Sequence, residues 1–258
     1  MRECSIIAEA GSCHDGNAKA AVELVKIAAA AGANAVKFQY WSDSQALALA
    51  RHDENLAALY ERYRLSRGWL ADLSAEARHH GMEFLCTVYL QQDIATIAPY
   101  VDKFKIASPD ALNEPFIQAH EAYHKPILVS VGMLTERELE HSLYGVAHKR
   151  YYLHCVSAYP CPLDQVNLGA IRRYHLSGFS DHTGDPCMGA WAYLAGANIL
   201  ETHFRADDTP SSNPDYPHAL SPLLLKAYVD NVRQAQAAYG DGVKVTQPAE
   251  AETRRYMA

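Results

Sequence analysis

The chain has 258 residues, of which 49% are hydrophobic and 21% are charged, a balance typical of a globular protein and inconsistent with disorder along its whole length. Its 23 Lys and Arg against 30 Asp and Glu give a net charge of −7, which argues against nucleic-acid binding because such proteins carry a basic excess. The sequence holds no apolar run of about 18 residues that would span a membrane, and its six scattered cysteines form no CxxC pair. We therefore expect a cytoplasmic protein with reduced thiols.

Short apolar segments typical of strands alternate along the chain with longer amphipathic or alanine-rich segments typical of helices. The strand candidates span residues 5–8, 35–39, 83–88, 103–107, 126–131, 151–155, 178–180 and 198–201. The clearest helix candidates span residues 17–31, 67–80, 91–98, 114–123, 135–144, 186–195 and 223–239. Eight strands, each followed by a helix or by room for one, predict an α/β protein with a single domain, a closed (β/α)8 TIM barrel over residues 1–258.

Two further features support one barrel. The tetrapeptide Ala-Gly-Ala-Asn occurs at residues 31–34 and again at 195–198, and in both places Gly32 or Gly196 is expected to end a helix just before a strand begins. Residues 207–222 are rich in Pro, Ser and Asp. We interpret them as a long loop above the barrel and not as a domain boundary.

Barrel enzymes build their active sites from residues at the carboxyl ends of the strands, and here nearly every predicted strand ends on polar side chains. These are Glu9, Lys37, Gln39, Thr87, Tyr89, Lys105, Ser108, Asp110, Ser130, His154, Ser157, Tyr159, Ser180, Asp181, His182, Glu201 and His203. Each has a structural explanation by itself, and Glu9 could simply pair with Lys37 on the next strand. Their coincidence at one barrel mouth favours a functional site.

The residue types indicate the chemistry of that site. Lys37 and Lys105, with Thr87, Ser108 and Ser130, form a donor-rich set suited to a phosphate or a carboxylate. Burying two lysines without anions would be costly, and a bound anion would remove that cost.

Histidines supply a second element of the predicted site. His182 and His203, on neighbouring predicted strands, are candidate ligands of one divalent metal that keeps open positions for substrate. Asp215 and His218, in the long loop, are expected to reach over the mouth and contact substrate hydroxyls.

Nine ordered segments that contain these residues resemble the sialic acid synthase family, also called the N-acetylneuraminate or nonulosonic acid synthases. They span residues 7–11, 14–16, 36–39, 105–108, 130–133, 153–160, 180–183, 201–204 and 215–219 and so cover nearly the whole chain. The resemblance implies a transferase that condenses phosphoenolpyruvate with an aldose or another aldehyde to give a 2-keto-3-deoxy sugar acid. Phosphate would leave by C–O cleavage.

The resemblance also implies a role for each matching residue. Phosphoenolpyruvate contacts fall on Lys37, Thr87, Lys105, Ser108 and Ser130, and acceptor contacts fall on Gln39, Asp110, Tyr159 and Asp215. The ligands of a divalent metal, most often Mn²⁺, fall on His182 and His203, and the catalytic glutamate falls on Glu9. The catalytic set is therefore Glu9, Lys37, Lys105, His182 and His203.

The sequence departs from the family pattern where the acceptor sugar should lie. Ser157 replaces an asparagine usual on the phosphoenolpyruvate side, and we assign it to that side. Asp110 replaces a longer glutamate, Cys13 replaces an asparagine, and Tyr216 replaces a histidine. Use of the pyruvyl donor is therefore better supported than any one acceptor.

The resemblance further implies a small C-terminal antifreeze-like domain, which this sequence does not contain. Either the sequence is a piece of a longer chain, or the natural protein works without that domain. We favour a stand-alone enzyme with an unusual acceptor, in which a homodimer is possible.

Two alternatives remain open at the level of sequence. One is a metal-dependent aldolase or isomerase on the same barrel, which would have no need of a phosphoenolpyruvate cradle. The other is a non-catalytic relative that binds ligand and depends on a partner subunit. Retention of the donor-rich set Lys37, Lys105, Ser108 and Ser130 argues against the aldolase or isomerase. The presence of Glu9, His182 and His203 argues against the non-catalytic relative.

Overall fold

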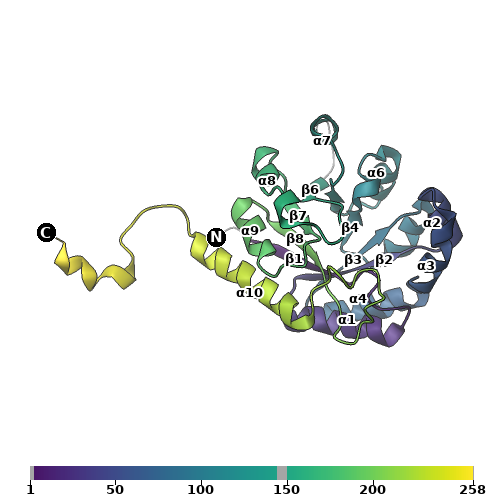
Figure 1. Ribbon diagram of the computed structural model, residues 1–258, viewed down its shortest axis with the longest axis horizontal. Coiled ribbons are helices and arrows are strands. Elements are labelled where there is room, and N and C mark those ends of the chain that lie inside the picture. The colour runs from purple at the N-terminus through teal and green to yellow at the C-terminus, as the bar shows by residue number, and fades with distance from the viewer. Residues whose placement is uncertain (1–2, 144–149, 258) are drawn as a thin grey trace.

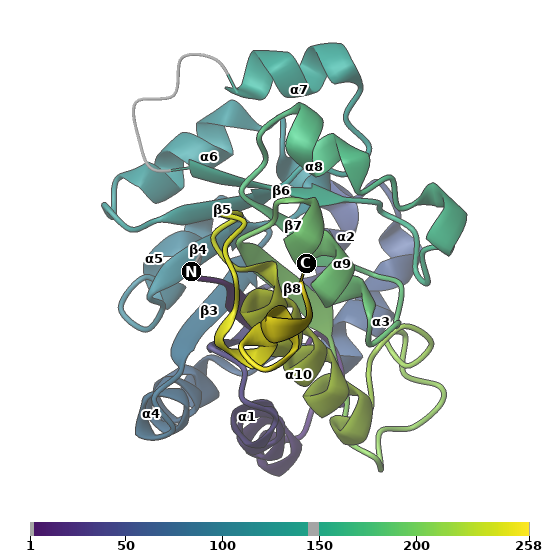
Figure 2. The ribbon, with the colours of Figure 1, turned by 90° about the vertical axis from the view of Figure 1, so that its left-hand side faces the viewer.

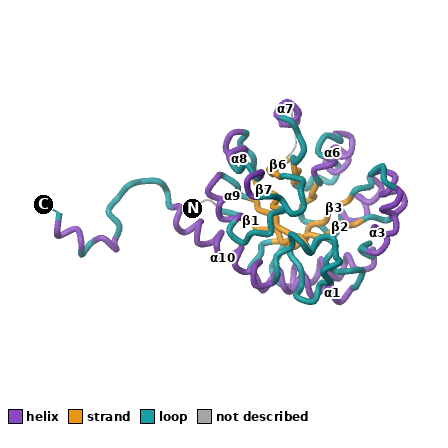
Figure 3. Tube along the Cα trace, in the orientation of Figure 1, coloured by secondary structure: helices purple, strands orange, loops and turns teal. Residues whose placement is uncertain are grey.

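The computed structural model describes residues 3–143 and 150–257, and its eight parallel strands close into a barrel in sequence order. The strands are β1 (Ser5–Glu9), β2 (Ala35–Tyr40), β3 (Glu83–Val88), β4 (Lys103–Ile106), β5 (Ile127–Ser130), β6 (Arg150–Cys155), β7 (Gly178–Asp181) and β8 (Ile199–His203). Figure 3 shows them as the core inside a ring of helices. The predicted TIM barrel is confirmed, including all eight strands.

The helices follow the strands as a (β/α)8 fold requires (Figure 1). They are α1 (Ala18–Ala31), α2 (Ser44–Ala50), α3 (Ala57–Arg62), α4 (Leu70–His79), α5 (Ile94–Ile97), α6 (Glu114–Glu121), α7 (Glu136–Leu143), α8 (Gly169–Arg173), α9 (Met188–Ala195) and α10 (Pro222–Tyr239). The predicted helices are confirmed, except that Tyr144 of the segment 135–144 lies outside the described residues. The sequence reading missed α2, α3 and α8, which span seven, six and five residues and are too short for a periodic pattern to emerge.

The repeated tetrapeptide does end two helices. The backbone of Gly32, at the end of α1, has φ +87°, and that of Gly196, at the end of α9, has φ +129°. The amide of each glycine donates to a carbonyl in the last turn of its helix. A side chain would disfavour this backbone conformation, so glycine permits the sharp turn into the next strand.

The barrel interior is layered, because alternate residues of a strand point to the same side. Ile7, Ala35, Leu85, Leu128 and Leu153 form a buried apolar cluster inside the barrel. Two residues further along the same strands come Glu9, Lys37, Thr87, Ser130 and Cys155. The apolar layer is thus a floor, and the layer above it points polar groups toward the carboxyl ends of the strands.

Two segments complete the fold. The loop between β8 and α10 returns to the barrel, where Phe204 pairs with Leu220 in an isolated bridge, and α10 then packs against α1 and α9 (Figure 2). Residues 240–257 extend away from the barrel with two short 3-10 turns, at Pro248–Glu250 and Thr253–Tyr256 (Figure 1). Among the described residues, no helix has both the length and the apolar character needed to cross a bilayer.

Candidate active site

A cavity of about 470 Å³ lies at the carboxyl ends of the strands. The predicted site residues that line it are Glu9, Lys37, Gln39, Thr87, Lys105, Ser108, Ser130, Tyr159, His182, His203, Asp215 and His218. Two other predicted residues, Asp110 and Ser157, are not in its wall. The structure therefore brings most of the predicted residues into one cavity.

Strand register places these groups next to each other. Lys37 of β2 is opposite Glu9 of β1, and Thr87 of β3 is opposite both Gln39 of β2 and Lys105 of β4. Because the strands are parallel and staggered around the barrel, side chains from four consecutive strands converge on one volume.

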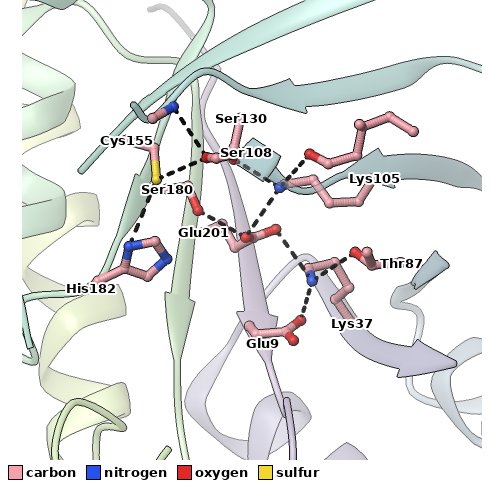
Figure 4. Close-up of polar contacts among 12 residues, drawn as sticks. Glu9, Lys37, Thr87, Lys105, Ser108, Ser130, Cys155, Ser180, His182 and Glu201 are labelled. Carbon is pink, nitrogen blue, oxygen red and sulfur yellow. Dashed lines mark hydrogen bonds and ion pairs between the residues drawn. The ribbon is translucent and has the colours of Figure 1, made fainter. Parts of the chain in front are cut away.

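The ammonium group of Lys37 has three polar partners (Figure 4). Its Nζ lies 2.5 Å from Oε2 of Glu9 and donates to Oγ1 of Thr87 at 3.2 Å, while Oε2 of Glu201 lies 3.9 Å away. Burial by itself would lower the pKa of Lys37, but Glu201 and Glu9 outweigh it and raise the pKa above its ordinary value. Lys37 is therefore a cation at neutral pH, and the Glu9 pairing considered from sequence does form.

Lys105 occupies a less compensated position. Its Nζ donates to Oγ of Ser130 at 2.8 Å and to the Ile106 carbonyl at 3.1 Å, and Oε1 of Glu201 lies 3.7 Å away (Figure 4). Burial lowers the pKa of Lys105 below its ordinary value, because the nearby carboxylate offsets the loss of water only in part. An added anion would stabilise this ammonium group.

Glu201, which the sequence analysis listed at a strand end without giving it a role, lies at the centre of this charge network. It is 3% exposed, lies between the two lysines and accepts a hydrogen bond from Ser180 at 2.9 Å. Burial opposes its ionisation, but Lys105 and Lys37 together lower its pKa. Glu201 thus supplies much of the negative charge that the sequence analysis expected a bound anion to provide for Lys37 and Lys105. Its place among the strand-end residues, together with two lysines that need a counter-charge, was the signal for this role.

Tyr89, also listed at a strand end without a role, acts on Glu9 through Gln39. The Tyr89 hydroxyl donates to Oε1 of Gln39 at 2.8 Å, and Nε2 of Gln39 donates to Oε1 of Glu9, also at 2.8 Å. Burial raises the pKa of Glu9, although Lys37 opposes this effect. The Tyr89 hydroxyl therefore holds the Gln39 amide in the orientation that hydrogen-bonds the Glu9 carboxylate.

The two predicted residues outside the cavity wall have other surroundings. The Asp110 carboxylate accepts two hydrogen bonds from the Arg51 guanidinium, at 2.7 and 3.2 Å. The Arg51 guanidinium also lies 5.2 Å from the centre of the Tyr89 ring. The Oγ atom of Ser157 is buried and has no hydrogen-bond partner in the part of the chain that the structure describes. Acceptor contact by Asp110 and phosphoenolpyruvate contact by Ser157 stay predictions.

The rings of three histidines, His182, His203 and His218, lie close together in the cavity wall. The rings of His182 and His203 lie 5.5 Å apart, and those of His203 and His218 lie 4.6 Å apart. Nδ1 of His182 lies 2.8 Å from the Val156 carbonyl. Because a carbonyl can only accept, Nδ1 carries a proton, and Nε2 of the neutral ring has a lone pair that can bind a metal. Burial lowers the pKa of His203 and of His218, so both rings are neutral and can bind a metal.

The donor set fits a divalent ion. The ligand atoms of His203, Asp215 and His218 lie within 4.8 Å of one another, and no other group of this kind occurs among residues 3–143 and 150–257. Imidazoles with one carboxylate suit several first-row metals. His203 belongs both to this group and to the predicted pair, whereas His182 belongs only to the pair.

Comparison with known proteins identifies the family. The model of the NeuB family matches residues 24–244. The chain is 31% identical to the N,N'-diacetyllegionaminic acid synthase of Campylobacter jejuni, over 97% of this chain and 81% of that protein. It is 26% identical to the human N-acetylneuraminate-9-phosphate synthase, over 96% of this chain and 74% of that protein.

A solved structure agrees with these matches. The sialic acid synthetase of Leptospira borgpetersenii superimposes with a TM-score of 0.88 at 26% identity, over 98% of this chain and 91% of that one. Sequence and fold thus agree over nearly the whole chain, and the cavity carries the lysines, hydroxyls and carboxylate expected of such a synthase. The chain belongs to the NeuB family of phosphoenolpyruvate-dependent nonulosonic acid synthases.

Proposed function

We propose that the cavity binds phosphoenolpyruvate over Lys37 and Lys105 and condenses it with an open-chain aldose or another aldehyde. The product would be a 2-keto-3-deoxy sugar acid. The observation that carries this proposal is the pair of buried ammonium groups beside the hydroxyls of Thr87, Ser108 and Ser130. A ligand with one phosphate and one carboxylate matches two cations and several neutral donors.

The proposed reaction forms one C–C bond and breaks one C–O bond. C3 of phosphoenolpyruvate attacks the aldehyde carbon, which leaves an oxocarbenium centre at C2. Water adds at C2, and the tetrahedral intermediate then loses inorganic phosphate. Lys37 and Lys105 stabilise the negative charge of the phosphate and carboxylate electrostatically. Glu9 delivers the proton that turns the aldehyde oxygen into the new hydroxyl.

We infer that a divalent ion, most often Mn²⁺ in such enzymes, binds at the histidine side of the cavity, with His182 and His203 as the ligands expected from sequence. The neutral His203 ring and the Nε2 lone pair of His182 support this assignment. When bound, such an ion polarises the aldehyde oxygen as a Lewis acid. The Tyr159 ring contacts the His182 ring in a tilted arrangement, with ring centres 4.2 Å apart.

Gln39, Tyr159 and Asp215 line the part of the cavity where the acceptor would lie, and we assign them to acceptor contact. We also infer a cytoplasmic location, which the free, buried thiols of Cys86 and Cys155 support. The oligomeric state is open between a monomer and a homodimer. Sedimentation of the purified protein tests the dimer.

The first experiment is a calorimetric titration of phosphoenolpyruvate into metal-stripped protein, with and without Mn²⁺, because it does not depend on the unknown acceptor. We expect saturable binding that is lost in Lys105→Met, a variant that keeps the length of the side chain and removes its charge. Lys125→Met is the matched control, since Nζ of Lys125 bonds the Ala98 and Val101 carbonyls away from the cavity. Absence of binding under both conditions would contradict the proposal.

Positive binding leads to the second experiment, a screen of aldoses for phosphate release from phosphoenolpyruvate. A synthase releases phosphate only when the acceptor is present. An aldolase or isomerase on the same barrel would turn over an aldose without consuming phosphoenolpyruvate, and a non-catalytic relative would bind the donor without release.

A further inference from the structure

The loop between β8 and α10, residues 204–221, folds back onto the loop that follows β1, and Asn213 joins the two. Asn213 is 2% exposed and lies outside the wall of the cavity. Its Nδ2 donates to the Ser12 carbonyl at 2.9 Å, and its Oδ1 accepts from the Ser12 hydroxyl at 2.7 Å. The same Oδ1 accepts from the backbone amide of Asp215 at 3.0 Å. One buried side chain therefore bonds both Ser12 and the backbone of its own loop.

Asp215, which lines the cavity, is bound by Ser12 as well. Oδ2 of Asp215 accepts from the Ser12 backbone amide at 2.6 Å and from the Ser12 hydroxyl at 2.8 Å. Because a hydroxyl carries one proton, that proton is shared between Asp215 and Asn213. These bonds engage Oδ2 and leave Oδ1 3.6 Å from Nε2 of His218, another residue of the cavity wall. Ser12 thus determines how the Asp215 carboxylate is turned in the cavity.

Two glycines allow the loop after β1 to lie this close. Gly11 has φ +49°, and a Cβ atom there would lie 2.2 Å from Oδ2 of Asp215. Gly16 has φ +69°, and a Cβ atom there would lie 2.8 Å from the carbonyl of Arg62, the last residue of α3. Both the close contacts and the positive φ disfavour a side chain at these positions. Residues 11–16 are therefore packed between Asp215 and α3, and they support the carboxylate from outside the cavity.

From these contacts we propose that Ser12 and Asn213 are positioning residues, which hold the Asp215 carboxylate in the orientation that contacts the acceptor. The inference rests on the proposed function, in which Asp215 contacts the acceptor. Neither Ser12 nor Asn213 was assigned a role from sequence, because neither lies at the end of a strand. They act through Asp215, from outside the cavity.

This role predicts a selective effect on the acceptor. In the described part of the chain, Lys37 and Lys105 make no hydrogen bond to Ser12 or Asn213, so the donor site does not depend on the Ser12–Asn213 contact. A hydrogen bond to a charged group changes binding about tenfold or more. Loss of the contact should therefore weaken acceptor binding and leave phosphoenolpyruvate affinity unchanged. A contact that only stabilised the fold would not separate the two substrates.

The first experiment needs no substrate and measures hydrogen exchange by mass spectrometry in peptides from residues 10–17 and 204–221. Asn213→Ala should speed amide exchange in both segments about fivefold or more, because the bonds that join them are lost. Circular dichroism confirms that the variant is folded. Ser212→Ala is the matched control, since Ser212 is the exposed neighbour of Asn213 and its variant should exchange as the wild type does. Wild-type exchange in Asn213→Ala would overturn the proposal.

The second experiment is steady-state kinetics with an aldose that supports phosphate release. Asn213→Ala and Ser12→Ala should each raise the KM for the aldose about tenfold and change kcat less. Calorimetry should show unchanged phosphoenolpyruvate affinity in both variants. Ser12→Thr keeps the hydroxyl and should retain the wild-type KM. If the contact acts through Asp215, then Asn213→Ala should add nothing to the loss caused by Asp215→Ala.

The outcomes separate this inference from the proposed function. Faster exchange with an unchanged KM for the aldose would overturn the positioning role and leave the proposed function intact. Equal losses of aldose and phosphoenolpyruvate binding would also overturn it, because they would indicate a general loss of cavity structure. If no aldose supports phosphate release from the wild type, the proposed function fails and the positioning role fails with it, whereas the exchange measurement still decides whether Asn213 fixes the loop.

Discussion

Oε1 of Glu201 lies 3.7 Å from Nζ of Lys105, although the two residues belong to β8 and β4, which lie across the barrel from each other in the ring of eight strands. Because Glu201 also lies 3.9 Å from Lys37, one carboxylate compensates two buried cations. The two lysines of the cavity thus face two nearby carboxylates, those of Glu201 and Glu9. A bound anion adds negative charge to the cavity. We expect Lys105 to stabilise that anion most, because its carboxylate partner Glu201 lies farther away than the Glu9 partner of Lys37.

Glu201→Gln should destabilise the unliganded protein by about 3–5 kcal/mol, because removing one partner leaves buried charge uncompensated. Inorganic phosphate should restore more stability to this variant than to the wild type. Urea denaturation with and without phosphate measures both effects. The control is Glu83→Gln. The ion pair that Glu83 forms with Lys103 is partly exposed, so its removal should cost less than about 1 kcal/mol of stability. Equal stability of the two variants would contradict the role of Glu201.

Tyr89→Phe should lower the rate of phosphate release about tenfold and leave phosphoenolpyruvate affinity unchanged. The loss is smaller than the roughly 10²–10⁴-fold that a positioned acid or base itself contributes, because Tyr89 acts on Glu9 only through Gln39. Without the Tyr89 hydroxyl, the Gln39 amide is free to turn its oxygen toward Glu9. Steady-state kinetics and calorimetry together separate the two effects. If Tyr89 acts through Gln39, then Tyr89→Phe should add nothing to the loss caused by Gln39→Ala.

The control for this prediction is Tyr63→Phe. Tyr63 is buried in the same aromatic cluster but does not line the cavity, so its variant should retain the wild-type rate. An additive loss in the double variant would show that the Tyr89 hydroxyl acts by a route other than Gln39.

His14 should make stability fall in acid. It is 1% exposed, and burial lowers its pKa from the ordinary 6.5 to about 4. Above pH 6.5 the imidazole is neutral in both the folded and the unfolded chain. Between pH 6.5 and 4 only the unfolded chain takes up the proton, so the folded state loses up to about 3 kcal/mol of stability.

Denaturation of the wild type and of His14→Gln across this pH range isolates that effect from the other titrating groups. The glutamine side chain can still accept the hydrogen bond that Nδ1 of His14 receives from the Gly16 amide. As the pH falls from 6.5 to 4, the free energy of unfolding of the wild type should decrease by about 3 kcal/mol relative to that of the variant. A difference independent of pH would contradict burial of a neutral His14.

Gly189→Ala should destabilise the barrel by about 1–3 kcal/mol through overpacking. A Cβ atom at Gly189 in α9 would lie 2.3 Å from a ring carbon of Tyr228 in α10, and that ring is fully buried. Thermal and urea denaturation measure the loss. Gly68→Ala, where the nearest atom lies 3.7 Å away, should change stability by less than about 0.5 kcal/mol.

Much of the fold and the cavity wall followed from local patterns. The apolar runs marked all eight strands, and the polar residue at each strand end marked the wall of the cavity, because strand periodicity and parallel packing direct those side chains to one face. Even the short β7, with few apolar residues, was correctly predicted. The short helices α2, α3 and α8 were missed, since fewer than eight residues carry too little periodicity to separate a helix from a loop.

The sequence by itself determined the barrel, the family and the identity of the donor-binding candidates, since these depend on residue type and on order along the chain. Only the tertiary structure decided which of those groups act on one another. Glu201 reaches two lysines across the barrel, Tyr89 reaches Glu9 through Gln39, and Asp215 meets His203 only when the long loop folds back. These contacts join residues far apart in the chain, and their distances depend on barrel closure and strand stagger, which no local pattern contains.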